Sequence, residues 1–163
     1  MRKQILSHLE KNCRLTPAEL AAMLGSTEEE VSAEIHAMED EKIICGYHAM
    51  IDWDKADSDW VTAMIGVKIS PVRGEGFDRI SKRISKFDEV QDVYLMSGSS
   101  WDLLLTIECA TMKEISHFVY EKLAPMESVV STATYFVLKK YKDHNVILGE
   151  DRSAADDRIP VMP

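Results

Sequence analysis

The hydrophobic pattern of the chain changes its period at residue 61, and this change constrains the fold more than any other feature of the sequence. Before it, in residues 1–45, apolar side chains recur every three or four positions, which is the spacing of helices with one buried face. After it the pattern alternates, and one face of an extended strand would carry Val61, Ala63, Ile65, Val67 and Ile69. The sequence therefore predicts a helical N-terminal module followed by a mixed α+β domain.

The N-terminal module has the sequence signals of three short helices. The first carries an apolar stripe of Ile5, Leu6, Leu9 and Cys13. The second begins at Thr16, which can form a capping box with Glu19, and stops at Gly25. The third begins at Thr27 with a second capping box to Glu30, and its buried stripe would contain Val31, Ile35 and Met38. Two helices separated by a glycine turn predict a helix-turn-helix.

Residues 61–142 predict strands and helices in the order βαββαβ. The strands are read from "VTAMIGVKIS", "VQDVYLMSG", "WDLLLTIECA" and "VVSTATYFVLKKYK", and the helices from "GEGFDRISKRISKF" and "TMKEISHFVYEKL". In the third strand we expect the inward side chains to be Trp101, Leu103, Leu105 and Ile107. This element order is that of a ferredoxin-like domain.

One face of the predicted sheet would be left without a helix, because both helices of a ferredoxin-like domain cover the same face. On the uncovered face we expect Met64, Tyr94, Met96, Leu104, Thr106, Thr132, Thr134 and Phe136. So many apolar side chains are rarely left in water. The simplest cover is a second copy of the chain, which predicts a two-fold homodimer.

These patterns divide the chain into four parts. Residues 1–45 are the helix-turn-helix domain and residues 46–60 a linker strand and hinge. Residues 61–142 are the ferredoxin-like domain. Residues 143–163 are expected to form a mobile tail, since the sequence has no pattern after about residue 148.

Composition narrows the class of protein. The formal net charge of −9 opposes general affinity for polyanions or anionic membranes. Three unpaired, widely spaced cysteines, no signal peptide and no 18-residue apolar run predict a cytoplasmic protein without disulfides. No catalytic triad, metal-spaced His/Cys cluster, EF-hand or phosphate loop is present, so we expect neither enzyme activity nor a metal or cofactor.

The order of these parts resembles the Lrp/AsnC (feast/famine) family of transcriptional regulators over residues 1 to about 142. The resemblance rests on "AELAAMLG", "VSAEIHAMEDEKII", "VYLMSGSSWDLLL" and "STATYFVLKKYK". It implies a winged helix-turn-helix that binds DNA and a C-terminal domain for assembly and effector binding. It also implies a small effector, usually an amino acid, held between dimers that associate into octamers.

A free amino acid needs donors for its carboxylate, an acceptor for its ammonium and a pocket for its side chain. The loop "MSGSSWD" offers backbone N–H groups around Gly98, Ser99 and Ser100 and the carboxylate of Asp102. The resemblance adds apolar walls from Leu95, Met112, Phe136 and Val137. The predicted effector set is completed by Met96, Ser97 and Thr134. In the family two residues usually separate this Gly from this Asp, whereas here there are three, Trp101 among them.

The third helix is unusually acidic for one that would read DNA. Residues 1–50 hold five basic and nine acidic side chains, a net charge of −4. The family commonly places Arg or Lys where this chain has Ala33, Glu34, His36 and Ala37. The remaining candidates for contact with DNA are Arg14, Thr16, Thr27, Ser32, His36 and Lys42. Few phosphate contacts predict weak binding by each module, which several linked modules can offset.

Two functions of different class therefore remain open. The first is a transcriptional regulator that binds DNA and responds to an amino acid. The second is an amino-acid-binding assembly module whose N-terminal domain has weak or lost DNA affinity and contacts proteins instead.

Overall fold

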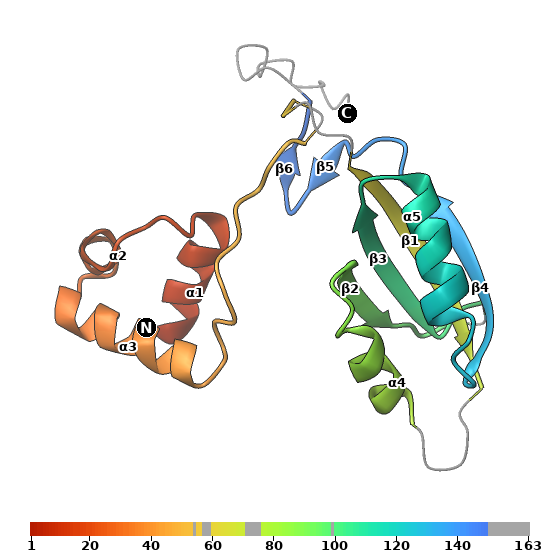
Figure 1. The fold of residues 1–163 in the computed structure, drawn as a ribbon. Helices are drawn as coiled ribbons and strands as arrows, with labels where there is room; N and C mark the ends of the chain where they lie inside the picture. Colours follow the sequence, from red (N-terminus) through yellow and green to blue (C-terminus); the bar gives the residue numbers. More distant parts are fainter. Residues whose placement is uncertain (54, 57–59, 71–75, 99, 150–163) are drawn as a thin grey trace, which may run out of the picture. The chain divides into compact units, whose positions relative to one another are not determined.

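The structure, a computed structural model, describes residues 1–53, 55–56, 60–70, 76–98 and 100–149 (Figure 1). The chain divides into two compact units, Met1–Ile51 and Asp52–Pro163. The division falls within residues 46–60, the segment predicted to be the linker. We describe each unit by itself.

The N-terminal unit contains three α-helices, α1 (Arg2–Lys11), α2 (Pro17–Leu24) and α3 (Glu28–Asp40). Both predicted capping boxes are present, Thr16 with Glu19 and Thr27 with Glu30. After α2 the chain reverses at Gly25, whose φ of 65° is left-handed and suits glycine. The predicted helix-turn-helix is confirmed.

One small core holds these helices together. It consists of Ile5, Leu9, Leu20, Ala21, Val31, Ile35 and Met38. Leu6 is partly buried against this core, whereas Cys13 lies beyond the end of α1 and is partly exposed. The spacing of the apolar residues thus predicted which side of each helix is buried.

The segment after α3 is extended but forms no β-strand in the part of residues 44–60 that the structure describes. It leaves α3 at Lys42, whose φ of 58° is left-handed, and the N–H groups of Ile43 and Ile44 donate to the carbonyl of Met38. A strand needs a neighbouring strand, and no ladder pairs this segment with the rest of the described chain. The described part of residues 46–60 therefore does not form the predicted linker strand.

The second unit contains a four-stranded antiparallel sheet in the order β2-β3-β1-β4. Its strands are β1 (Val61–Ile69), β2 (Val90–Leu95), β3 (Leu103–Cys109) and β4 (Val129–Phe136). The helices are α4 (Phe77–Ile84) and α5 (Met112–Phe118), which continues as a π-helix, η1 (Val119–Leu123). This order and this topology confirm the predicted ferredoxin-like domain (Figure 1).

Both helices pack on one face of the sheet, since α4, α5 and the strands share a single core. From the strands that core receives Ala63, Ile65, Val67, Ile69, Leu103, Leu105, Ile107 and Cys109. The helices contribute Ile80, Ile84, Ile115, Phe118 and Leu123. The predicted alternation in β1 is confirmed.

The uncovered face differs in part from the prediction. Residues directly opposite each other in paired strands share a face. Phe136 lies opposite Ala63, Thr134 opposite Ile65 and Thr132 opposite Val67, so these three β4 residues lie on the helix side. The uncovered face instead carries Ser131, Ala133 and Tyr135 from β4, besides Met64, Tyr94, Leu104 and Thr106. Alternation within β4 does not distinguish its two faces, because both contain small or polar residues.

Trp101 also lies on the uncovered face, and its predicted inward orientation is wrong. Its indole ring packs over Gly66, where a Cβ would lie 2.6 Å from two of the ring carbons. Gly66 alternates with Ile65 and Val67, which are buried on the helix side, so its missing side chain would point to the other face. Trp101 precedes β3 and therefore need not follow the alternation of that strand.

The chain after β4 forms a hairpin where a tail was predicted. Strands β5 (Lys142–Asp143) and β6 (Val146–Ile147) flank His144 and Asn145, whose φ values of 40° and 67° are those of a tight hairpin turn. The N–H of Gly149 donates to the Asp52 carboxylate at 2.9 Å, which fastens the hairpin to the start of the unit. The rest of the predicted tail, residues 150–163, lies outside the described residues.

Candidate functional site

The outer side of α3 is the candidate surface for contact with DNA. His36 is exposed, and its Nδ1 lies 2.8 Å from the backbone carbonyl oxygen of Ser32. A carbonyl only accepts, so Nδ1 carries the proton in this contact and Nε2 of a neutral ring is left as an acceptor. The structure therefore brings Ser32 and His36 together as a polar pair one helical turn apart.

The other predicted DNA contacts lie at the helix ends. The Thr16 hydroxyl accepts from the Glu19 N–H at 3.2 Å and donates to the Glu19 carboxylate at 2.9 Å. The Thr27 hydroxyl accepts from the Glu30 N–H at 3.3 Å. Both threonines thus begin helices. Arg14 and Lys42 are exposed, in the turns that follow α1 and α3 respectively.

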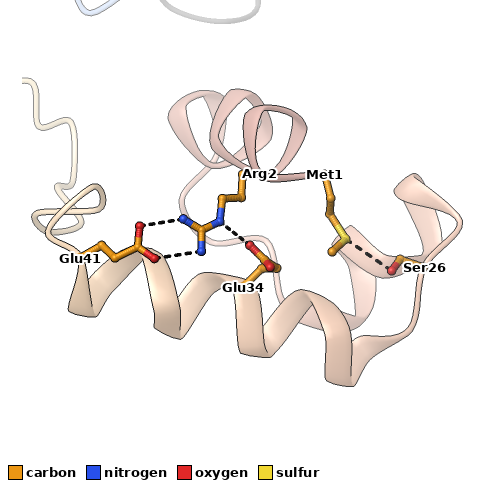
Figure 2. A network of polar contacts seen from close by, with 5 residues as sticks. All are labelled: Met1, Arg2, Ser26, Glu34 and Glu41. Carbon is orange, nitrogen blue, oxygen red and sulfur yellow. Dashed lines mark hydrogen bonds and ion pairs between the residues drawn. The ribbon is translucent and has the colours of Figure 1, made fainter.

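Four carboxylates of α3 and its C-cap have partners inside the N-terminal unit. Arg2 pairs with Glu34 and Glu41, as Figure 2 shows. Glu30 accepts from the Ser26 hydroxyl at 2.5 Å, and Glu39 accepts from the Tyr47 hydroxyl at 2.8 Å. The acidic helix therefore exposes less unpaired charge than its sequence suggests.

The pKa values follow these contacts. The hydrogen bonds from the Arg2 guanidinium hold the pKa of the Glu41 carboxyl below its usual range. The Ser26 hydroxyl, followed by the Thr27 N–H, lowers the pKa of Glu30. Both carboxyl groups are thus kept ionised by neighbours in their own unit.

The loop between β2 and β3 is the candidate effector site, and Asp102 holds the end of this loop to β1. One Asp102 carboxylate oxygen accepts from the Ile69 N–H at 2.8 Å, and the other accepts from the Lys68 ammonium at 3.1 Å. The Ile69 N–H, with the Lys68 ammonium second, holds the pKa of Asp102 below its usual range. Asp102 was predicted to bind an effector ammonium; in the isolated chain both of its oxygens already have partners.

The tip of this loop is exposed. The Met96 N–H donates to the Asp102 carbonyl at 2.8 Å and closes the loop, and Ser97, Gly98 and Ser100 lie beyond that bond. Open space surrounds the position of a Gly98 Cβ, so the fold does not itself require glycine there. Ser99, which was predicted to take part, lies outside the described residues.

The remaining predicted effector residues lie far from this loop in the same chain. The loop binds the Val67–Ile69 end of β1, because the Asp102 N–H donates to the Val67 carbonyl. Phe136 pairs with Ala63, and the Val137 N–H donates to the Thr62 carbonyl at the opposite end. Five residue steps along β1, from Val67 to Thr62, separate these ends by about 17 Å. The predicted residues therefore form two groups within one chain.

The first group is the loop group, Leu95–Asp102. The second group, hereafter the far group, contains Phe136, Val137 and Met112; α5 begins with Met112, shortly after Cys109, which pairs with Val61. Leu95 and Met112 are exposed at 61% and 53%. Thr134, opposite Ile65, lies between the two groups.

A cavity of about 290 Å³ lies beside α5 and η1 and was not predicted from the sequence. Lys122 lines it, pairs with Glu89 and lies over the rings of Phe87 and Phe118. No group of three His, Cys, Asp or Glu residues in the described segments could hold a metal ion. The Lys122 side chain in the cavity wall is therefore held in place by a carboxylate and two aromatic rings.

Comparison with known proteins decides the family. Residues 62–147 match the model of the Lrp/AsnC ligand-binding domain. The chain is 45% identical over 163 residues to an uncharacterized HTH-type transcriptional regulator, YugG, of Bacillus subtilis, covering 98% of this chain and 95% of that one. The chain belongs to the Lrp/AsnC family.

More distant relatives of this Lrp/AsnC chain agree. It is 26% identical to the leucine-responsive regulatory protein of Haemophilus influenzae, covering 89% of this chain and 86% of that one. Its fold matches that of transcriptional regulator NMB0573 of Neisseria meningitidis, solved as an L-Met complex. That match has a TM-score of 0.65 and 27% identity and covers 87% of this chain and 90% of that one. The protein is thus a member of a family of transcriptional regulators.

Two features of this Lrp/AsnC member were missed by reasoning from the sequence. The contacts of Asp102 with Lys68 and Ile69 depend on strand register, which the sequence does not show. The pairing of Arg2 with Glu34 and Glu41 joins residues more than thirty positions apart, although the seven-residue spacing of the two glutamates placed them on one side of α3.

No helix in the described part of the chain is long and apolar enough to cross a membrane.

Proposed function

We propose that this Lrp/AsnC chain binds DNA through its helix-turn-helix and changes that binding when an amino acid occupies its C-terminal domain. One observation carries the proposal: the same chain contains a helix-turn-helix and the Lrp/AsnC ligand-binding domain. In the helix-turn-helix, α2 and α3 each begin with a capping box. A relative named as an HTH-type transcriptional regulator matches 98% of this chain, and therefore both parts.

The two separated groups of effector residues support a site built from two copies. The loop group has N–H donors and a carboxylate, but both oxygens of that carboxylate already have partners, and Leu95 is its one predicted apolar wall; the other predicted walls lie in the far group. If the loop group of one copy faces the far group of another, all three are supplied together. The L-Met complex of the Neisseria protein supports an amino acid as the class of ligand.

The uncovered sheet face supports a homodimer as the basic unit. Met64, Tyr94 and Tyr135 are 38%, 50% and 55% exposed on it. An apolar face of this kind is most simply covered by its own copy through a two-fold axis. Association of such dimers into an octamer would bring several helix-turn-helix units to one stretch of DNA, which would offset weak binding by each.

The test is a gel shift of the purified protein on DNA from upstream of its own coding region, with and without a mixture of the twenty amino acids. We expect a shifted band whose midpoint concentration changes when the mixture is added. A shift that the mixture leaves unchanged would refute effector control, and a lack of any shift at low salt would refute DNA binding.

A second function is favoured by one specific observation, the net charge of −4 in residues 1–50. In that case the chain is an amino-acid-binding assembly module that acts through protein partners. Binding of an amino acid measured by calorimetry, together with no gel shift, is the result that distinguishes it from the regulator.

A further inference from the structure

One side of α3 carries a row of carboxylates, Glu30, Glu34 and Glu41, separated by four and seven residues. Residues at these spacings lie on the same side of a helix. When a recognition helix enters the major groove, its sides face the phosphate backbones. Carboxylates on that side would repel the phosphates unless something in the protein held them.

Arg2 holds two of the three, and Figure 2 shows the arrangement. Its Nε lies 2.6 Å from a Glu34 carboxylate oxygen, and its Nη1 and Nη2 lie 2.7 and 2.9 Å from the two oxygens of Glu41. One guanidinium from the first turn of α1 therefore bridges two turns of helix. Its bidentate contact fixes the Glu41 carboxylate in both position and orientation.

These contacts act only at the surface, since the Arg2 side chain is 41% exposed. Exposed ion pairs add little to folding stability. They matter more for the electrostatic potential around α3. The two carboxylates together with Arg2 have a net charge of −1, whereas the two carboxylates alone would have a net charge of −2. Ser32 and His36, the two candidates for contact with DNA bases, are not among the residues to which Arg2 donates its side-chain hydrogen bonds.

We propose that Arg2 is a positioning residue for DNA binding, which holds Glu34 and Glu41 against α1 and partly neutralises them. The proposal rests on the proposed function, because it assumes that α3 docks on DNA. It assigns Arg2 an indirect role: the cation acts on the two carboxylates of its own chain and does not contact a phosphate.

The experiment measures affinity for the upstream DNA fragment by fluorescence anisotropy at low and high salt. We expect Arg2→Gln to weaken binding about tenfold at low salt, because like charges are then brought together. At high salt the deficit should shrink, since screening reduces repulsion between charges near the surface. The matched control is Lys3→Gln, which changes the net charge equally from the next position of α1 and should leave affinity within about twofold.

A triple variant, Arg2→Gln with Glu34→Gln and Glu41→Gln, separates the indirect role from direct contact. We expect it to regain wild-type affinity, because the carboxylates that Arg2 held are gone. Arg2→Gln with Glu10→Gln and Glu127→Gln has the same net charge and should stay weak. Circular dichroism melting confirms that each variant is folded at the assay temperature.

Three results would overturn the proposal. Equal losses in Arg2→Gln and Lys3→Gln would mean that only net charge matters, and equal rescue by both triple variants would mean the same. A Glu34/Glu41 triple variant that stays weak would make Arg2 a direct phosphate contact. If the wild-type protein itself does not bind the fragment, the proposed function fails and the role of Arg2 falls with it; binding by the wild type with an unaffected Arg2→Gln refutes the role of Arg2 alone.

Discussion

At the scale of single residues, glycines have different roles in the two segments that surround the candidate effector site. Gly66 in β1 is required sterically, because the Trp101 ring occupies the place of its side chain. Gly98 at the loop tip has open space around it. Trp101 is one of the three residues between Gly98 and Asp102, so this loop packs on the glycine of a neighbouring strand.

Gly66→Ala tests this packing. We expect the free energy of unfolding in urea to fall by about 1–3 kcal/mol, the usual cost of an added methyl group in a filled site. The matched control is Gly98→Ala, which should be nearly neutral. Equal effects of the two substitutions would show that Trp101 does not fill the space over Gly66.

At the scale of elements, the sequence predicted the helices and strands well because capping boxes and apolar spacing are local signals. Thr16, Thr27 and Gly25 mark helix ends in the sequence, and the structure has all three in those roles. Properties that depend on strand register were not predictable. The side of the sheet on which Phe136 lies, and the partners of Asp102, follow from how β1 pairs with β4 and from where the β2–β3 loop meets β1.

Asp102 links three of these elements and gives stability a defined pH dependence. Its pKa in the folded protein lies below that of the unfolded chain, because the Ile69 N–H and Lys68 bind its ionised form. Its contribution is therefore present above the unfolded pKa and is lost as the pH falls through the folded pKa. We expect the unfolding free energy to fall between pH 5 and pH 2, values that bracket the ordinary pKa of aspartate of about 3.9.

Asp102→Asn should reduce that fall, because the amide does not titrate. Urea denaturation at several pH values measures the difference between the wild type and the variant. The exposed Asp88→Asn serves as the control. A pH dependence that is identical in the wild type and Asp102→Asn would show that the carboxylate has no special partners in the folded state.

At the scale of the whole molecule, the uncovered sheet face leads us to expect a dimer in solution. Tyr135→Lys places a charge on that face and should shift the sedimentation coefficient toward that of a monomer, because burying an unpaired ammonium is costly. Tyr120→Lys is the matched control, since Tyr120 in η1 is 77% exposed and belongs to the helix side. Dissociation by both substitutions, or by neither, would argue against this face as the dimer contact.

The central claim is that an amino acid binds between the loop group of one copy and the far group of another. Gly98→Trp should block the loop group, and Met112→Trp should block the far group. Both positions are exposed, so each has room for the larger side chain. Each variant alone should bind no amino acid in titration calorimetry. A site shared between copies predicts that reassociated mixtures of the two variants regain about one quarter of the sites, since that fraction combines two unblocked groups in a randomly mixed symmetric assembly. Mixtures that exchange subunits but still bind nothing would contradict the claim, because a site within one chain would be blocked in every copy.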